Sequence, residues 1–158
     1  MQVTFKCLDQ TTDEIPYHLL LLADPSVKLV MEYINRGHCF LAFLDEEIVG
    51  IVVLVHNDLD HYEIVNIAVK EKHQGKGIGK QLIQKALEEA RRLGATTLEI
   101  GTGNSSIPQL KLYQKCGFRI IGVDHDFFIR NYDEEIYEDG IQCRDMIRLR
   151  MSLINEVE

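Results

Sequence analysis

The sequence has no tryptophan, few prolines and no excess of basic charge. Among its 158 residues, 25 acidic side chains outnumber 17 basic ones, which gives a formal net charge of −8. A general nucleic-acid binder needs a basic surface that displaces counterions from phosphates, so this balance argues against that class. No linker rich in proline, glycine or serine and no internal repeat interrupts the chain. We therefore expect one continuous domain, residues 1–158.

Paired cysteines and long apolar runs are also missing. The four cysteines form no Cys-x-x-Cys pair and the six histidines form no His-Glu-x-x-His pattern, so neither a disulfide framework nor a zinc site is predicted. The strongest apolar run, residues 48–55, is too short for a membrane span, and the polar N-terminus does not resemble a signal peptide. We expect no metal, no membrane partner, no nucleic-acid partner and a reducing cytoplasmic location.

What the sequence does contain is 46% hydrophobic residues, enough for a folded core. Apolar runs and alternation predict strands at 3–8, 39–44, 48–55, 62–69, 96–100, 118–123 and 146–151, with a hairpin turn at 45–47. Helical spacing and capping signals predict helices at 16–22, 26–36, 78–93 and 106–116. The order of these elements predicts a three-layer α/β domain with a mixed sheet.

The most informative passage is a glycine-rich turn, residues 74–79, between the strand at 62–69 and the most regular helix. Free backbone N–H groups at a helix start, together with the helix dipole, make an anion site, and glycines let a bulky phosphate approach the backbone. A Rossmann fingerprint fails because Lys80 stands where its third glycine should be. A P-loop ending in Gly79-Lys80 fails because Gln74 and Gln81 replace the glycine and the Ser or Thr that it needs.

The remaining pattern, Gln74-x-x-Gly77-x-Gly79, resembles the pyrophosphate-binding signature of the GCN5-related N-acetyltransferases (GNAT), a family that uses acetyl-coenzyme A. A second segment, Leu112-Tyr113-x-Lys115-x-Gly117-Phe118, resembles another signature of the same family, and the order of the elements matches over nearly the whole chain. The alternative interpretation of the first pattern alone is a flexible turn before a good helix. The resemblance implies a three-layer α/β/α GNAT-like domain with a central mixed, mostly antiparallel sheet.

The same resemblance implies a coenzyme site. The backbone of the strand end would separate from its neighbour at 96–100 and pair with the pantetheine arm, while the turn would hold the pyrophosphate, with Lys76 or Lys80 adding charge. Members commonly carry an Asn where this chain has Ser106, and Asn104 lies two residues earlier. Ser105 or Ser106 would then do part of the work of that Asn. The implied coenzyme contacts are Ile67, Ala68, Val69, Gln74, Gly75, Lys76, Gly77, Ile78, Gly79, Lys80, Asn104 and Ser106.

Two residues are candidates for the chemistry. Tyr113 matches the family's tyrosine that approaches the sulfur, and a phenol of pKa about 10 protonates a thiolate only with help from its site. Glu63 stands where some members have a carboxylate that acts as a general base through water. The alternatives are a core aromatic for Tyr113 and a solvated acid at the strand end for Glu63, and many members need no dedicated base.

The charges of the chain separate into two regions. Residues 70–92 contain seven basic and three acidic side chains, whereas residues 124–140 contain seven acidic side chains and Arg130, interleaved with aromatic residues. An acidic, aromatic loop at 124–140 suits a cationic amine through charge attraction and cation–π contacts, although a solvated loop has the same composition.

The resemblance therefore implies an acetyl-CoA-dependent N-acetyltransferase that acts by direct transfer in a ternary complex on a primary amine of a small molecule. A protein or peptide amine is an alternative acceptor. An alternative of another class is a module of the same fold that binds acyl-CoA as a sensor without turnover. The family also makes a homodimer plausible.

Overall fold

The computed structural model describes residues 2–154, and its contacts divide the chain into two units: an N-terminal unit up to Ala95 and a C-terminal unit from Thr96. The single domain expected from the sequence stays a prediction. Among residues 2–154, no helix is long and apolar enough to cross a membrane, and no cluster of three or more His, Cys, Asp or Glu could hold a metal ion. The four cysteines are free thiols.

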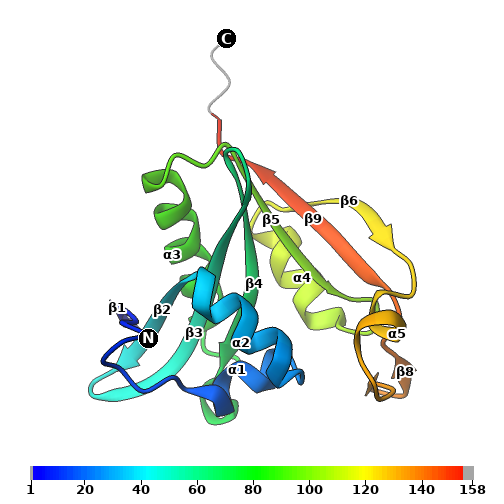
Figure 1. Cartoon of the computed structure of the whole chain (residues 1–158), viewed down its shortest axis with the longest axis horizontal. Coiled ribbons are helices and arrows are strands. Elements are labelled where there is room, and N and C mark those ends of the chain that lie inside the picture. The colour runs from blue at the N-terminus through cyan, green and yellow to red at the C-terminus, as the bar shows by residue number, and fades with distance from the viewer. Residues whose placement is uncertain (1, 155–158) are drawn as a thin grey trace. The chain divides into compact units, whose positions relative to one another are not determined.

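The N-terminal unit is a four-stranded antiparallel sheet with helices on both faces (Figure 1). The strand order is β1-β2-β3-β4, and every neighbouring pair is antiparallel. Its elements are β1 (Thr4–Cys7), α1 (Tyr17–Ala23), α2 (Val27–Arg36), β2 (His38–Leu44), β3 (Glu47–Asp58), β4 (His61–Val69), a 3-10 turn η1 (Glu71–His73) and α3 (Ile78–Arg92).

Alternate side chains of β3 point to the two opposite faces of this sheet. Ile51, Val53 and Val55 join a buried cluster with residues of α1 and α2, such as Leu20 and Ile34. On the other face, a Cβ at Gly50 would lie 3.0 Å from Leu82 Cδ1 of α3 and 3.2 Å from the Ala68 carbonyl oxygen. Glycine at position 50 therefore allows α3 to pack closely on the sheet. The three layers predicted from the sequence are present within this unit.

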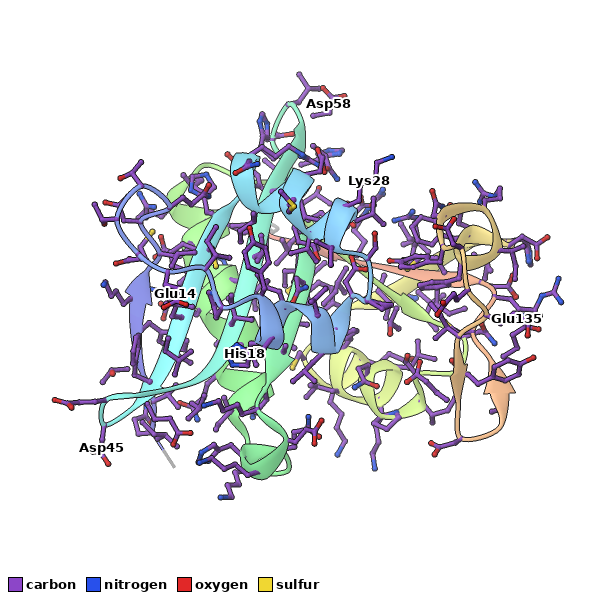
Figure 2. The ribbon with its side chains drawn as sticks, turned by 60° about the horizontal axis from the view of Figure 1, so that its bottom comes forward. Glu14, His18, Lys28, Asp45, Asp58 and Glu135 are labelled. Atoms are coloured by element: carbon purple, nitrogen blue, oxygen red, sulfur yellow. The ribbon has the colours of Figure 1, made fainter. Side chains whose placement is uncertain are left out.

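The hairpin between β2 and β3 is tighter than predicted. Leu44 pairs directly with Glu47, so the turn consists of Asp45 and Glu46, and Asp45 has a positive φ of 55°. Asp45 lies at the tip of the hairpin (Figure 2). Glu47, which the sequence analysis placed in the turn, is instead the first residue of β3.

The C-terminal unit has an antiparallel three-stranded ladder in the order β5-β9-β6, and Gly101 of β5 lies opposite Arg148 of β9. The expectation of a plain loop at 124–140 was wrong, because this segment contains a short helix and half of a small hairpin. The elements are β5 (Thr97–Gly103), α4 (Ile107–Lys115), β6 (Arg119–Asp124), α5 (Phe127–Asn131), β7 (Tyr137–Glu138), β8 (Ile141–Gln142) and β9 (Met146–Ser152).

Candidate active site

The glycine turn, residues 74–77, carries the chain from η1 to α3 in the N-terminal unit. Gly75 and Gly77 have φ of 78° and 81°, in the left-handed region that residues with a Cβ rarely adopt. A Cβ at either position would meet nothing within 4 Å. Glycine is therefore required at these positions by the backbone conformation rather than by lack of space.

The N-terminus of α3 presents unused hydrogen-bond donors. Gly77 is its N-cap and has no side chain to accept a bond, and no acidic residue lies in the first turn. The N–H of Gln81 donates to the Gly77 carbonyl oxygen at 3.3 Å, but no hydrogen bond within residues 2–154 uses the N–H groups of residues 75–80. Because the helix dipole adds positive potential at this end, the turn is suited to bind a phosphate.

Gln74 closes this turn onto the end of β4. Its side-chain Nε2 donates to the Val69 carbonyl oxygen at 3.0 Å, and its backbone N–H donates to the Glu71 carbonyl oxygen at 3.2 Å. The free backbone donors therefore begin at Gly75. The direct contact of Gln74 with the pyrophosphate stays a prediction.

The basic residues around the turn fall into two groups. Lys70, Lys72 and His73 contact the carboxylate of Glu47, and the hydrogen bonds from Lys72 and Lys70 lower the pKa of that carboxyl to about 2. In contrast, the exposed cations of the turn and the first helical turn form no ion pair with any described residue; these are Lys76 and Lys80. Their charge is available to an anionic ligand.

β4 contains a bulge that changes which side chains share a face. Asn66 pairs with Val53 but Ile64 pairs with Leu54, so Val65 is the extra residue. Glu63, beyond the bulge, pairs with Val55, whose side chain belongs to the cluster under α1 and α2. We infer that the bulge brings Glu63 to the same face of the sheet as Asn66.

The predicted base and the predicted pantetheine-binding segment both lie on β4. Glu63 is half-buried, and its Oε1 accepts a hydrogen bond from Asn57 Nδ2 at 2.8 Å. Residues 67–69 pair with β3 in regular antiparallel register. The chemical roles assigned to Glu63, Ile67, Ala68 and Val69 stay predictions.

A buried polar network that was not predicted from the sequence lies beside this strand. Asn66 is 3% exposed, and its Nδ2 donates to the Leu20 carbonyl oxygen at 2.9 Å and to the Tyr33 hydroxyl oxygen at 2.8 Å. Tyr33 in turn donates to Asp24 Oδ2 at 3.1 Å, whereas Asn66 Oδ1 is buried with no hydrogen-bond partner among the described residues. The available signal was a single amide within an otherwise apolar strand segment, Ile64–Val69.

Tyr113 lies on α4 in the C-terminal unit and is buried, with 4% exposure. Its ring meets Phe118 edge-on, with the centroids 6.4 Å apart. Burial, with a smaller contribution from Cys116, raises the pKa of the Tyr113 phenol above its ordinary value. The phenol is therefore protonated at neutral pH and available as a hydrogen-bond donor.

Two of the residues that could replace the family's Asn, Asn104 and Ser106, have structural partners. Asn104 Oδ1 accepts from the backbone N–H groups of Arg144 and Asp145 at 2.8 and 3.0 Å, and its Nδ2 donates to the Gln142 carbonyl oxygen at 3.1 Å. The Ser106 hydroxyl donates to Glu138 Oε1 at 2.7 Å. These bonds fix the connection between β5 and α4, and a contact of Asn104 or Ser106 with the coenzyme stays a prediction.

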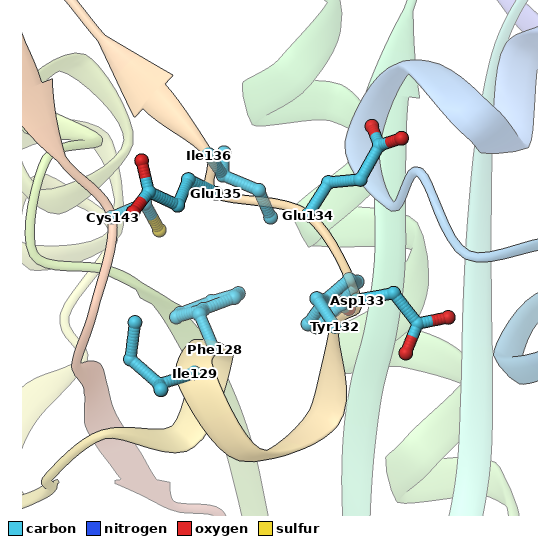
Figure 3. Close-up of a pocket in the computed structure, with 8 residues that line it drawn as sticks. All are labelled: Phe128, Ile129, Tyr132, Asp133, Glu134, Glu135, Ile136 and Cys143. Carbon is cyan, nitrogen blue, oxygen red and sulfur yellow. The ribbon is translucent and has the colours of Figure 1, made fainter.

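An open cavity of about 150 Å³ is lined by α5, the segment that follows it and Cys143 (Figure 3). The carboxylates of Asp133 and Glu134 point away from its centre (Figure 3). The rings of Phe128 and Tyr132 are 5.4 Å apart between centroids. The cavity thus combines aromatic walls with acidic groups at its rim. Its lining consists of Phe128, Ile129, Tyr132, Asp133, Glu134, Glu135, Ile136 and Cys143.

Comparison with known proteins decides the family. Residues 9–118 match the acetyltransferase (GNAT) family. The chain belongs to the GNAT family. An uncharacterized N-acetyltransferase from Bacillus subtilis, YvbK, is 60% identical over 145 residues, which cover 92% of this chain and 93% of that protein.

Solved GNAT structures confirm the predicted fold class. A protein from Bacillus cereus described as an IAA acetyltransferase has a TM-score of 0.92 and 49% identity, covering 96% of this chain and all of that one. A GNAT acetyltransferase from Elizabethkingia anophelis, crystallised with acetyl-CoA bound, has a TM-score of 0.93 and 48% identity, covering 96% of this chain and 98% of that one. These comparisons confirm the predicted family and the predicted enzyme class, an acetyltransferase. They also confirm acetyl-CoA, the coenzyme that the resemblance implied.

Proposed function

We propose that this GNAT protein transfers the acetyl group of acetyl-CoA directly to a primary amine of a small molecule within a ternary complex. The observation that carries the proposal is the set of free N–H groups at residues 75–80. This segment contains two left-handed glycines, Gly75 and Gly77, and two lysines without an ion pair among the described residues, Lys76 and Lys80. This arrangement suits the pyrophosphate of a coenzyme. The backbone of Ile67, Ala68 and Val69 would hold the pantetheine arm, as an added strand is held.

In the proposed reaction, the amine nitrogen attacks the thioester carbonyl carbon. A carbon–nitrogen bond forms, the carbon–sulfur bond breaks, the amine loses a proton and the sulfur leaves as a thiolate that gains one. Tyr113 would donate a hydrogen bond and then a proton to this sulfur. The burial that raises the pKa of this phenol keeps it a neutral hydrogen-bond donor but opposes the loss of its proton, so the transfer to sulfur needs further help from the site. Glu63 would take the proton of the amine through water.

We further propose that the acceptor is cationic and that the cavity after α5 holds it. Asp124 pairs with Arg130 and Asp126 with Arg144, but the acids at the cavity rim form no ion pair within the described part of the chain; these are Asp133, Glu134 and Glu135. The adjacent rings of Phe128 and Tyr132 add cation–π attraction for an ammonium group. Unpaired negative charge and aromatic walls together favour a cation over a neutral acceptor.

A direct assay tests the proposed activity. Purified protein is mixed with acetyl-CoA and a panel of polyamines, aminoglycosides, amino acids, peptides and IAA, and both free thiol and acetylated product are measured. We expect thiol release matched by product for one class of small amine. Coenzyme binding without product from any acceptor would support the sensor alternative, and product from peptides alone would reassign the acceptor. A cytoplasmic location and a homodimer complete the proposal, and cell fractionation and light scattering would test them.

A further inference from the structure

Glu47 contacts three basic side chains of the segment that precedes the glycine turn. Its Oε2 lies 3.1 Å from Lys70 Nζ and 3.0 Å from Lys72 Nζ, and its Oε1 lies 3.4 Å from His73 Nε2. Glu47 begins β3, so it belongs to the rigid sheet rather than to the turn. The carboxylate therefore links the sheet to the segment from which the proposed coenzyme site begins.

The linked segment, residues 70–74, has a defined backbone of its own. The Lys70 N–H donates to the Val49 carbonyl oxygen at 2.8 Å, and the His73 N–H donates to the Lys70 carbonyl oxygen at 2.8 Å. The His73 side chain is 14% exposed, and its Nδ1 is buried without a partner, so the contact with Glu47 is the polar contact of this ring among the described residues. The position of the His73 ring thus depends on Glu47.

An anionic coenzyme is attracted by positive charge, and a carboxylate at this position reduces that positive charge. It neutralises cations beside a proposed phosphate site, and it brings its own negative charge close to that site. Its three contacts at one carboxylate instead suit a mechanical role. We propose that Glu47 is a positioning residue for the coenzyme, which fixes residues 70–74 so that the N–H groups of 75–80 converge on the pyrophosphate. This inference rests on the proposed function of the glycine turn.

The sign of the effect separates positioning from charge. If Glu47 acted through charge alone, Glu47→Gln would tighten coenzyme binding, because it removes a negative charge. Positioning predicts the opposite: the Kd for coenzyme A and the KM for acetyl-CoA rise about tenfold, since residues 70–74 must then be ordered on binding. The kcat at saturating acetyl-CoA and the KM for the acceptor stay within about twofold of wild type.

Glu46→Gln is the matched control. It makes the same change of charge one residue earlier, at an exposed side chain with no ion pair among residues 2–154. We expect its coenzyme affinity to equal that of wild type. Glu47→Asp, which keeps the charge on a shorter side chain, should recover part of the lost affinity.

Amide hydrogen exchange of the free protein provides a readout that does not depend on turnover. The hydrogen-bonded amides of this segment, those of His73 and Gln74, should exchange faster in Glu47→Gln than in wild type or Glu46→Gln, and α3 beyond Leu82 should not change. Unchanged or tighter coenzyme binding by Glu47→Gln, with normal binding by wild type, would overturn the positioning role alone. A wild-type protein that binds no coenzyme A in calorimetry would overturn the proposed function and this inference together.

Discussion

The glycine turn and the acidic segment at 124–140 carry opposite charge, and they form their sites in different ways. In the turn, the donors are backbone N–H groups, and the side chains of Gly75 and Gly77 matter by being absent. In the acidic segment, the cavity is made by side chains such as Phe128 and Glu134. A site made by the backbone leaves a local sequence signature, whereas a site made by side chains depends on how short elements fold around it.

The largest expected effect tests the backbone site. Gly77→Glu should abolish detectable coenzyme binding, because it strains a left-handed position by about 1–2 kcal/mol and places negative charge against the phosphates. Calorimetric titration with coenzyme A measures the loss. Gly94→Glu is the control, since Gly94 has a similar φ of 86° and equally open surroundings at the other end of α3. Wild-type affinity in Gly77→Glu would mean that the turn is only a connection.

The second prediction tests the chemical step separately from the binding of coenzyme and acceptor. Tyr113→Phe should lower kcat about 100-fold, the size of a lost general acid, and leave the Kd for coenzyme A unchanged. Single-turnover kinetics measure the chemical step directly. Tyr17→Phe removes the hydroxyl of a partly buried tyrosine, and that hydroxyl forms no hydrogen bond among the described residues, so this change should not affect kcat. If chemistry limits the rate and kcat does not fall in Tyr113→Phe, the residue has no part in the mechanism.

A third, smaller effect tests the side-chain site. The double variant Asp133→Asn/Glu134→Gln should raise the KM for a cationic acceptor about three- to tenfold at low salt, and the effect should shrink as salt screens the charges. The KM for acetyl-CoA should not change. Asp139→Asn, an exposed acid of the same segment outside the cavity lining, is the control. Equal effects of both changes would make the acidity a general surface property.

The same contrast explains what could be predicted from the sequence. The β4–turn–α3 passage was predicted closely because apolar periodicity over 15 helical residues and paired glycines are local signals. The short α5 was missed because its five residues have no buried face and no side-chain cap. The bulge at Val65 and the partners of Glu47 were also missed, because strand register and ion pairs arise only when distant residues meet.

The smallest expected effect concerns Glu47, the carboxylate that contacts the segment before the glycine turn. Glu47 is ion-paired, whereas the acids at the cavity rim form no ion pair among the described residues. Its folded-state pKa of about 2 lies below the ordinary value of 4.5, so its contribution to stability is present above about pH 4.5 and is lost as the pH falls toward 2. The side chain is 36% exposed, and we expect Glu47→Gln to lower the Tm by about 1–3 °C at pH 7. Thermal melts between pH 7 and 3 should show this difference narrowing toward the acid end, and Glu46→Gln should match wild type throughout. A difference that stays constant with pH would mean that the Glu47 carboxylate is not its source.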